Sequence, residues 1–171
     1  MTDTAMTEVS LRAVEKEDLD FLFMLENTTD IARAGFATAP ASRRMLWEYI
    51  ENYTADIFAD KQLRLIVVAE GKAVGAVDIS DFDARDRRGF VGIDIAPQYR
   101  RRGYGRAALV QLCEYARTTI GMHQLTAVVA VDNTASLALF AACGFKACGC
   151  LRSWVRRGNS YTDARICQRL F

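Results

Sequence analysis

The sequence of 171 residues predicts a mixed α/β fold built on a mostly antiparallel, twisted central sheet. Two observations carry this prediction. About seven short apolar or β-branched runs and about four segments with helical spacing follow one another along the chain. Near the middle, a helix separates two of the strands, and a strand–helix–strand crossover pairs its strands in parallel, whereas hairpins pair them antiparallel. We therefore expect one parallel pair in the sheet and a single domain over residues 1–171.

The first half of the chain is expected to hold two helices and three strands. Apolar residues recur at helical spacing over residues 18–26 and 42–58. Strand-like runs flank Glu70-Gly71-Lys72, which has the composition of a hairpin turn, and a polar turn over residues 81–88 leads to the next strand. The three strands are residues 9–14, 63–69 and 73–80.

The second half begins with a strand at residues 91–96 and a helix that ends near Gly121. Asp132 or Asn133 is placed to cap a short helix that reaches Cys143, and Gly144 ends it. The remaining strands are residues 124–131, 145–155 and 161–170, the last two forming a hairpin.

Residues 90–106 join a strand to a helix through a turn rich in arginine and glycine. Ile93 and Ile95 lie on one face of the strand, and Pro97 ends it because proline has no N–H to donate. A helical pattern follows, so the turn lies at a helix N-terminus, where free N–H groups and the helix dipole attract anions. The predicted phosphate site consists of Arg100, Arg101, Arg102, Gly103, Tyr104, Gly105 and Arg106.

Two sequence motifs resemble those of the GNAT superfamily of N-acetyltransferases. Neither the Gly-Lys-Ser/Thr of a nucleotide triphosphate loop nor the Gly-x-Gly-x-x-Gly of a dinucleotide fold is present. Residues 100–105 instead fit the Arg/Gln-x-x-Gly-x-Gly/Ala pattern with which this family binds the pyrophosphate of acetyl-coenzyme A. Residues 133–145 resemble the family's second motif, Asn-x-x-(Ala/Ser)-x-x-x-(Tyr/Phe)-x-x-x-Gly-Phe. The resemblance is closest to the spermidine and ribosomal-protein N-terminal acetyltransferases.

The resemblance implies acetyl-CoA as co-substrate, no metal, and a GNAT-like sheet whose parallel central pair splays apart to receive the pantetheine arm. An amine then attacks the thioester directly, in a ternary complex, and a backbone N–H near the end of the first splayed strand polarises the acetyl carbonyl. Beyond the phosphate turn, the cofactor-binding residues implied by the resemblance are Ile93, Ile95, Ala96, Asn133, Ser136 and Phe140. For Asn133, a helix cap is the alternative role.

Acid–base groups are expected near the reacting amine. The spermidine enzymes carry a tyrosine as acid where this chain has Phe140, so we nominate Ser136, which matches a serine assigned that role in ribosomal-protein acetyltransferases. The candidate bases are Asp78 and Asp81, which match glutamates of the spermidine enzymes, and Asp94. An ordinary helix serine and solvated strand-end aspartates are the alternatives.

Composition excludes several other classes. Lys and Arg number 22 against 21 Asp and Glu, so the net charge of +1 provides no global attraction to nucleic acid or to an anionic membrane. The N-terminus has no signal-peptide pattern, and no apolar run approaches the roughly 20 residues that span a bilayer. A cytoplasmic protein is expected.

The cysteines and the single histidine also point away from disulfides and metal. Five cysteines without a disulfide spacing suit a reducing compartment, and we expect them to be small buried hydrophobes. One histidine and no Cys-x-x-Cys pair argue against zinc. The five are Cys113, Cys143, Cys148, Cys150 and Cys167.

The acceptor is less well defined than the donor. A polyamine or other small amine is the first choice, and a protein N-terminus is the alternative. Asn27, Arg33 and Phe36 resemble the loop of the polyamine enzymes, but residues 36–40 replace its acidic stretch. A non-catalytic acyl-CoA-binding module and a nucleic-acid patch on the arginines are the other hypotheses. A homo-oligomer is expected, as is common in the family.

Overall fold

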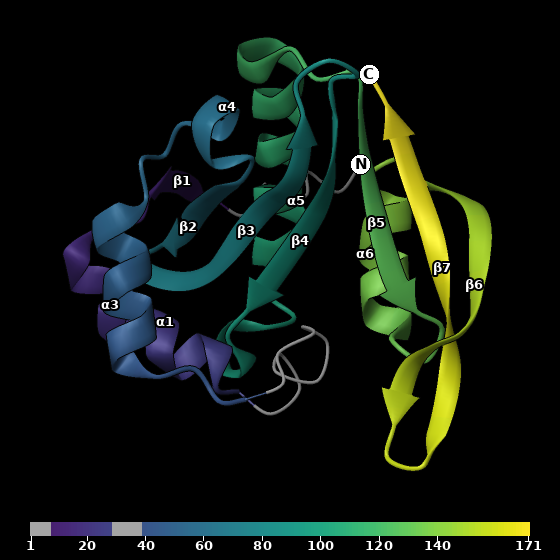
Figure 1. The fold of residues 1–171 in the computed structure, drawn as a ribbon, viewed down its shortest axis with the longest axis horizontal. Helices are drawn as coiled ribbons and strands as arrows, with labels where there is room; N and C mark the ends of the chain where they lie inside the picture. Colours follow the sequence, from purple (N-terminus) through teal and green to yellow (C-terminus); the bar gives the residue numbers. More distant parts are fainter. Residues whose placement is uncertain (1–7, 29–38) are drawn as a thin grey trace, which may run out of the picture.

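The computed structural model describes residues 8–28 and 39–171, and it shows a seven-stranded sheet with helices on both faces (Figure 1). The helices of the described chain are α1 (Leu19–Glu26), α3 (Arg43–Asn52), α4 (Ile57–Asp60), α5 (Tyr104–Tyr115) and α6 (Thr134–Ala142). The strands are β1 (Ser10–Ala13), β2 (Leu63–Ala69), β3 (Lys72–Asp83), β4 (Arg88–Ile95), β5 (Gln124–Ala130), β6 (Lys146–Arg157) and β7 (Ser160–Leu170).

The strand order is β1-β2-β3-β4-β5-β7-β6, and β4–β5 is the parallel pair. Each of the other neighbouring pairs is antiparallel. The predicted fold class and the predicted parallel pair are therefore confirmed. The parallel pairing covers only Arg88↔Gln124 to Phe90↔Thr126, although both strands run on beyond it. The two halves of the sheet consequently separate where β4 and β5 end.

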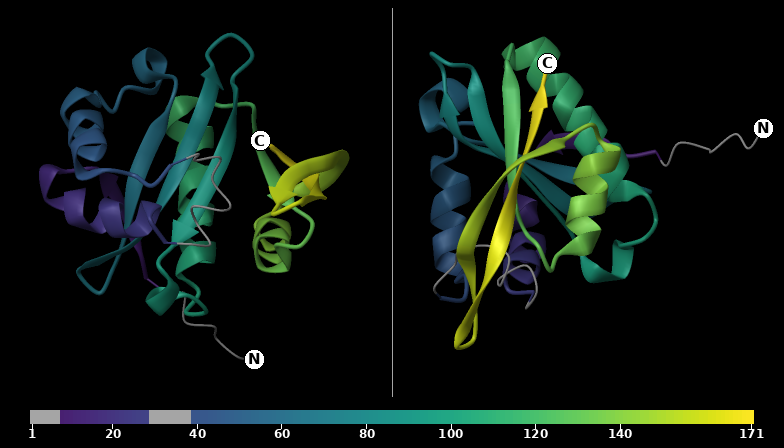
Figure 2. Two further views of the ribbon diagram at one scale, coloured as in Figure 1. Left: turned by 60° about the horizontal axis from the view of Figure 1, so that its bottom comes forward. Right: turned by 90° about the vertical axis from the view of Figure 1, so that its right-hand side faces the viewer.

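Helices α1 and α3 lie on one face of the sheet, and α5 and α6 lie on the other (Figures 1 and 2). The larger core forms between α5 and the sheet around Leu109, Leu112 and Leu125, each fully buried. A smaller core joins Leu22 of α1 and Leu46 of α3 to β2. We call the face of the sheet that packs against α5 the α5 face, and the opposite face, which packs against α1 and α3, the α1 face. The site described below uses both.

Two predicted elements differ from the structure. The single helix expected over residues 42–58 is two helices, because Tyr53 is extended and Ala55 has a φ of 57°. The Tyr53 hydroxyl accepts from the Arg64 backbone N–H at 2.6 Å, and Asp56 caps α4 through the Phe58 N–H. Residues 81–83, expected in a turn, belong to β3.

The expectation that all five cysteines are buried is wrong for two of them. Cys113, Cys143 and Cys167 are buried, but Cys148 and Cys150 are exposed. The two exposed cysteines lie on β6, which is the edge strand of the sheet and is exposed along most of its length. Position at the edge, rather than residue type, decides their exposure.

Candidate active site

A cleft of about 950 Å³ opens where β4 and β5 separate. It runs between the end of β4, the turn before α5, the first turns of α6 and the tip of the β6–β7 hairpin. The lining includes most of the residues predicted to bind the cofactor: Ile93, Ile95, Arg100, Arg101, Gly103, Tyr104, Gly105, Arg106, Asn133 and Ser136. Segments 40 residues apart in the sequence, around positions 95 and 135, therefore form one surface.

One end of the cleft is the N-terminus of α5. Gly103 precedes the helix with φ 82° and contributes no side-chain cap, so the first N–H groups of the helix remain available to a ligand. A residue with a side chain is strained at that φ, whereas glycine is not. The unpaired N–H groups, the helix dipole and the neighbouring arginines suit a pyrophosphate, and the predicted phosphate turn has the required geometry.

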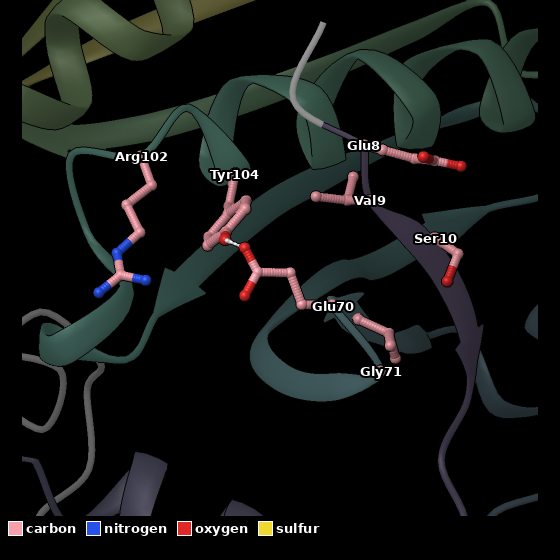
Figure 3. A pocket seen from close by; sticks show the side chains of 8 residues that line it. Glu8, Val9, Ser10, Glu70, Gly71, Arg102 and Tyr104 are labelled. Carbon is pink, nitrogen blue, oxygen red and sulfur yellow. Dashed lines mark hydrogen bonds between the residues drawn. The ribbon is translucent and has the colours of Figure 1, made fainter.

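Unlike the other residues of the predicted phosphate turn, Arg102 does not line the cleft. Its guanidinium lies 5.8 Å from the Tyr99 ring centroid, and its side chain borders a second hollow beside the β2–β3 hairpin (Figure 3). There the Tyr104 hydroxyl donates to the Glu70 carboxylate at 3.1 Å. The direct role predicted for Arg102 in the cofactor cleft is therefore not supported by its position.

The wall of the cleft is the open edge of β4. The Ala96 N–H donates to the carbonyl of Val74 in β3 at 2.9 Å, so the N–H of Ala96 faces β3. Because backbone groups alternate along a strand, those of Ile93 and Ile95 face the gap toward β5. Ala96 is fully buried, its N–H is used, and it does not line the cleft. Its contact with the cofactor stays a prediction. Arg100 Nε donates to the Ile95 carbonyl at 2.7 Å, which ties the turn to this edge.

The opposite wall is the start of α6. Asn133 Oδ1 accepts from the Ser136 N–H at 3.2 Å, so Asn133 caps the helix while it also lines the cleft. Ser136 is half-buried and lines the cleft as well. Phe140, in contrast, is 4% exposed and packs edge-on against Phe145 with ring centroids 5.0 Å apart. Phe140 does not line the cleft in this structure, and its contact with the cofactor stays a prediction.

The three predicted carboxylates occupy different environments. Asp94 lines the cleft. Asp78 forms an ion pair with Arg64, which opposes its use as a free base. Asp81 is exposed, has a φ of 48°, and lies where the β3–β4 register shifts, at the end of β4 remote from the cleft. Asp81 therefore lies away from the cleft, and its role as a base stays a prediction.

Asp94 has the surroundings of a proton acceptor. Ile93 and Ile95 pack on the α5 side, so the Asp94 side chain points to the α1 face, where Ala76 and Ala96 pack against Leu25. Burial raises the pKa of Asp94 to about 6, and the charges of Asp78 and Glu26 act in the same direction, while Arg64 and Arg100 oppose them. Such a carboxylate is ionised at neutral pH and holds a proton more readily than an ordinary aspartate.

Sequence reasoning missed Arg64 and Glu26. Arg64 is the second residue of β2, and its guanidinium pairs with Asp78 and with Glu26 Oε1, the latter at 2.7 Å. Burial lowers the pKa of Arg64, but the two carboxylates outweigh this effect and raise it. Tyr49 of α3 lies beside the guanidinium, 5.8 Å from ring centroid to Cζ. No spacing in the sequence joins these positions, so only the sheet register could reveal them.

The polyamine-loop resemblance falls partly outside the described residues, which do not include Arg33 and Phe36. Asn27 is described, and its side-chain amide donates to the carbonyls of Phe23 and Ala41, while its Oδ1 accepts from the Ala41 N–H. Asn27 therefore joins the end of α1 to the segment before α3. Its hydrogen bonds hold these two segments together.

Within residues 8–28 and 39–171, no group of three or more histidine, cysteine or acidic side chains is arranged to hold a metal ion. The helices of that same part of the chain are all too short or too polar to cross a membrane.

The fold, with its separated parallel pair and a glycine turn before α5, is that of the acetyltransferase class. The acetyltransferase (GNAT) domain family matches residues 8–146, and the chain belongs to this family. The resemblance found in the two motifs is thereby confirmed, and the protein is an acetyltransferase.

Its similar proteins include two spermidine N(1)-acetyltransferases. The protein from Vibrio cholerae is 28% identical over 140 residues, which cover 81% of this chain and 79% of the relative. That from Escherichia coli K12 is 25% identical over 160 residues, covering 93% and 84%. The crystal structure of the V. cholerae enzyme in complex with CoA and spermine superposes with a TM-score of 0.86 at 27% identity, covering 95% of both chains.

Proposed function

We propose that this acetyltransferase moves the acetyl group of acetyl-CoA to a primary amine of a polyamine or similar small cation, with both substrates bound together. One observation carries the proposal. A single cleft brings together the N-terminus of α5, which no side chain caps, the edge of β4 beyond its pairing with β5, and the partly buried carboxylate of Asp94. These are an anion site, a site for amide groups and a proton acceptor.

The residues present fit acetyl-CoA. The N–H groups at the start of α5 and the arginines of the turn would hold the pyrophosphate, and the Ile93–Ile95 edge would pair with the amides of the pantetheine arm. When bound, the cofactor supplies an activated acetyl thioester. The similar V. cholerae enzyme binds CoA, which supports this assignment.

Asp94 is proposed to remove the proton that the amine carries. An alkylammonium group has a pKa near 10, so it must lose a proton before it can attack, and an ionised carboxylate in contact with it accepts that proton. A backbone N–H on the β4 edge, at Ile93 or Ile95, would stabilise negative charge on the acetyl oxygen. Ser136 would donate a hydrogen bond to the leaving sulfur from the facing helix.

A cationic acceptor is supported by the charge of the α1 face. Glu26, Asp78 and Asp94 carry three carboxylates against the two guanidinium groups of Arg64 and Arg100 that act on Asp94. This excess of negative charge attracts ammonium groups rather than a neutral or acidic acceptor. The names of the similar proteins, spermidine N(1)-acetyltransferases, support the same acceptor class.

Thiol release from acetyl-CoA tests the proposal with a panel of spermidine, spermine, a monoamine of equal length, an aminoglycoside and a peptide with a free N-terminus. We expect the fastest transfer with a polyamine. Preference for the peptide would move the protein to the N-terminal class. Tight CoA binding without release on any amine would support a binding module and overturn the proposal.

We also propose that the chain forms one domain and assembles into a homo-oligomer. A similar V. cholerae spermidine N-acetyltransferase is dodecameric in a structure that superposes with a TM-score of 0.80 at 26% identity. Sedimentation velocity of the whole chain would detect the assembly, and a monomer at micromolar concentration would contradict it.

A further inference from the structure

Arg64 occupies an unusual position for an arginine at the start of a strand. Its side chain is only 21% exposed, and its guanidinium pairs with carboxylates from two other elements, Glu26 of α1 and Asp78 of β3. Both carboxylates are themselves mostly buried, at 29% and 23% exposure. Pairs buried to this extent are held in place more firmly than surface salt bridges.

The sheet register places Asp94 next to this group. Arg64 pairs across the sheet with Asp78, Asp78 pairs with Gly92, and Asp94 lies two residues further along β4 on the same face. Gly92 leaves the space between the two aspartates open, since a Cβ built there would have only Asp78 atoms within 4 Å, both at 3.9 Å. Three carboxylates therefore face one recess with one guanidinium.

The guanidinium engages only two of them. Hydrogen bonds join Arg64 to Asp78 and Glu26, whereas in the part of the chain that the structure describes the carboxylate of Asp94 accepts none. Asp94 is also the member of the three that lines the cleft. The carboxylates of Asp78 and Glu26 are therefore held by Arg64, and the carboxylate of Asp94 is available to a ligand in the cleft.

We infer that Arg64 is a positioning residue for acetyl transfer: by holding Glu26 and Asp78 in ion pairs, it leaves Asp94 as the carboxylate that accepts the proton of the acceptor amine. The inference rests on the proposed function and assigns its base.

Removal of the guanidinium changes the charge that Asp94 experiences. The charged groups that act on it are Glu26 from α1, Arg64 from β2, Asp78 from β3 and Arg100 from the turn, and Tyr49 from α3 lies beside Arg64. Without Arg64, the unpaired carboxylates of Glu26 and Asp78 would disfavour ionisation of Asp94. In the enzyme without substrate, Asp94 would then lose its proton only at higher pH. Proton transfer from substrate would then require more alkaline conditions.

The pH profile of kcat/KM tests the inference. We expect Arg64→Met to move the acid limb to higher pH by about one unit, a tenfold change in proton concentration. Arg64→Lys, which keeps the charge, should move it much less, and Glu26→Gln should move it to lower pH. Arg64→Met should also raise kcat/KM for spermine relative to a monoamine, because two carboxylates become available to ammonium groups. Unchanged acid limbs in Arg64→Met and Glu26→Gln would overturn the inference.

A second readout separates this inference from the proposed function and from misfolding. The carboxyl carbon of Asp94 can be titrated by NMR in the free protein, where no acetyl transfer is needed. Glu26→Gln is a nearly isosteric change that leaves Arg64 and Asp78 paired. If the pH midpoint of the Asp94 titration is lower in this variant, the charge of Glu26 acts on Asp94 as inferred, even when no amine is acetylated. An unchanged midpoint overturns it, whatever the activity.

Discussion

The two ends of the cleft are built in different ways. The proposed cofactor end comes from one continuous segment, residues 93–106, in which backbone geometry and glycine would make the anion site. The acceptor end is assembled from Glu26, Arg64, Asp78 and Asp94, which lie on four different elements. A local site depends on residue order, whereas a dispersed site depends on strand register. A shift of one residue between β3 and β4 would leave the first intact and turn Asp94 away from Asp78.

The largest effect is expected at the acceptor end. Asp94→Asn should lower kcat/KM by about 10²- to 10⁴-fold, because the amide cannot accept the ammonium proton, while the Kd for CoA stays unchanged. In the unaltered protein kcat/KM should rise with pH through about 6, since Asp94 must be ionised to act as a base. Steady-state rates from pH 5 to 8 measure both. Asp81→Asn is the matched control, and a loss as large in that variant would contradict the separation of the two aspartates.

The next effect isolates the cofactor end. Gly103→Asp should weaken CoA binding by about 100-fold, near 2.8 kcal/mol, because it adds a negative charge at the phosphate turn and strains a residue at φ 82°. Calorimetry of CoA binding gives the Kd. Gly121→Asp, with φ 72° at the other end of the same helical segment, imposes similar strain away from the turn. Equal losses in both variants would show that strain, rather than phosphate repulsion, is responsible.

Stability should change in the direction opposite to activity. Because the folded pKa of Asp94 is raised to about 6, the native state binds the proton more tightly than the unfolded chain. Stability therefore falls as pH rises from about 4 to 6, and above 6 the ionised group costs about 1 to 3 kcal/mol. Asp94→Asn should increase the free energy of unfolding at pH 8 more than at pH 4, as measured by urea denaturation. An equal change at both pH values would contradict a raised pKa.

Asn133 connects stability to cofactor binding on the facing helix. Asn133→Ala should cost about 1 kcal/mol of unfolding free energy because the Ser136 N–H loses its cap. Asn133→Ser keeps a capping oxygen and should restore most of that stability. If CoA binding weakens in both variants, the side-chain amide contacts the cofactor. If the affinity for CoA returns to that of the unaltered protein in Asn133→Ser, Asn133 acts only as a helix cap.

The smallest effect is expected at Ser136. Ser136→Ala should slow turnover by roughly tenfold or less, because a thiolate with a free-thiol pKa near 8.5 leaves without full protonation. Its Kd for CoA should be unaltered. A stopped-flow measurement of acetyl transfer at saturating substrates gives the rate, and an unchanged rate would make Ser136 a structural residue of α6.

Prediction from sequence succeeded where neighbouring residues interact. The strand before Pro97, the glycine turn and the Asn133 cap are local features, and the structure has all three. It failed where packing overrides a local pattern. Helical spacing continues through residues 42–58, yet the bond between Tyr53 and β2 interrupts the helix.

The order of residues in this chain already contained its fold class, its acetyltransferase motifs and the glycine turn before α5, because each depends on periodicity or on contacts within a few positions. The choice of Asp94 over Asp78 and Asp81 required three dimensions. Asp78 is paired by an arginine 14 positions away, and a bulge carries Asp81 off the cleft. A carboxylate is available as a base only when the rest of the fold leaves it unpaired and partly buried, and no short segment specifies that.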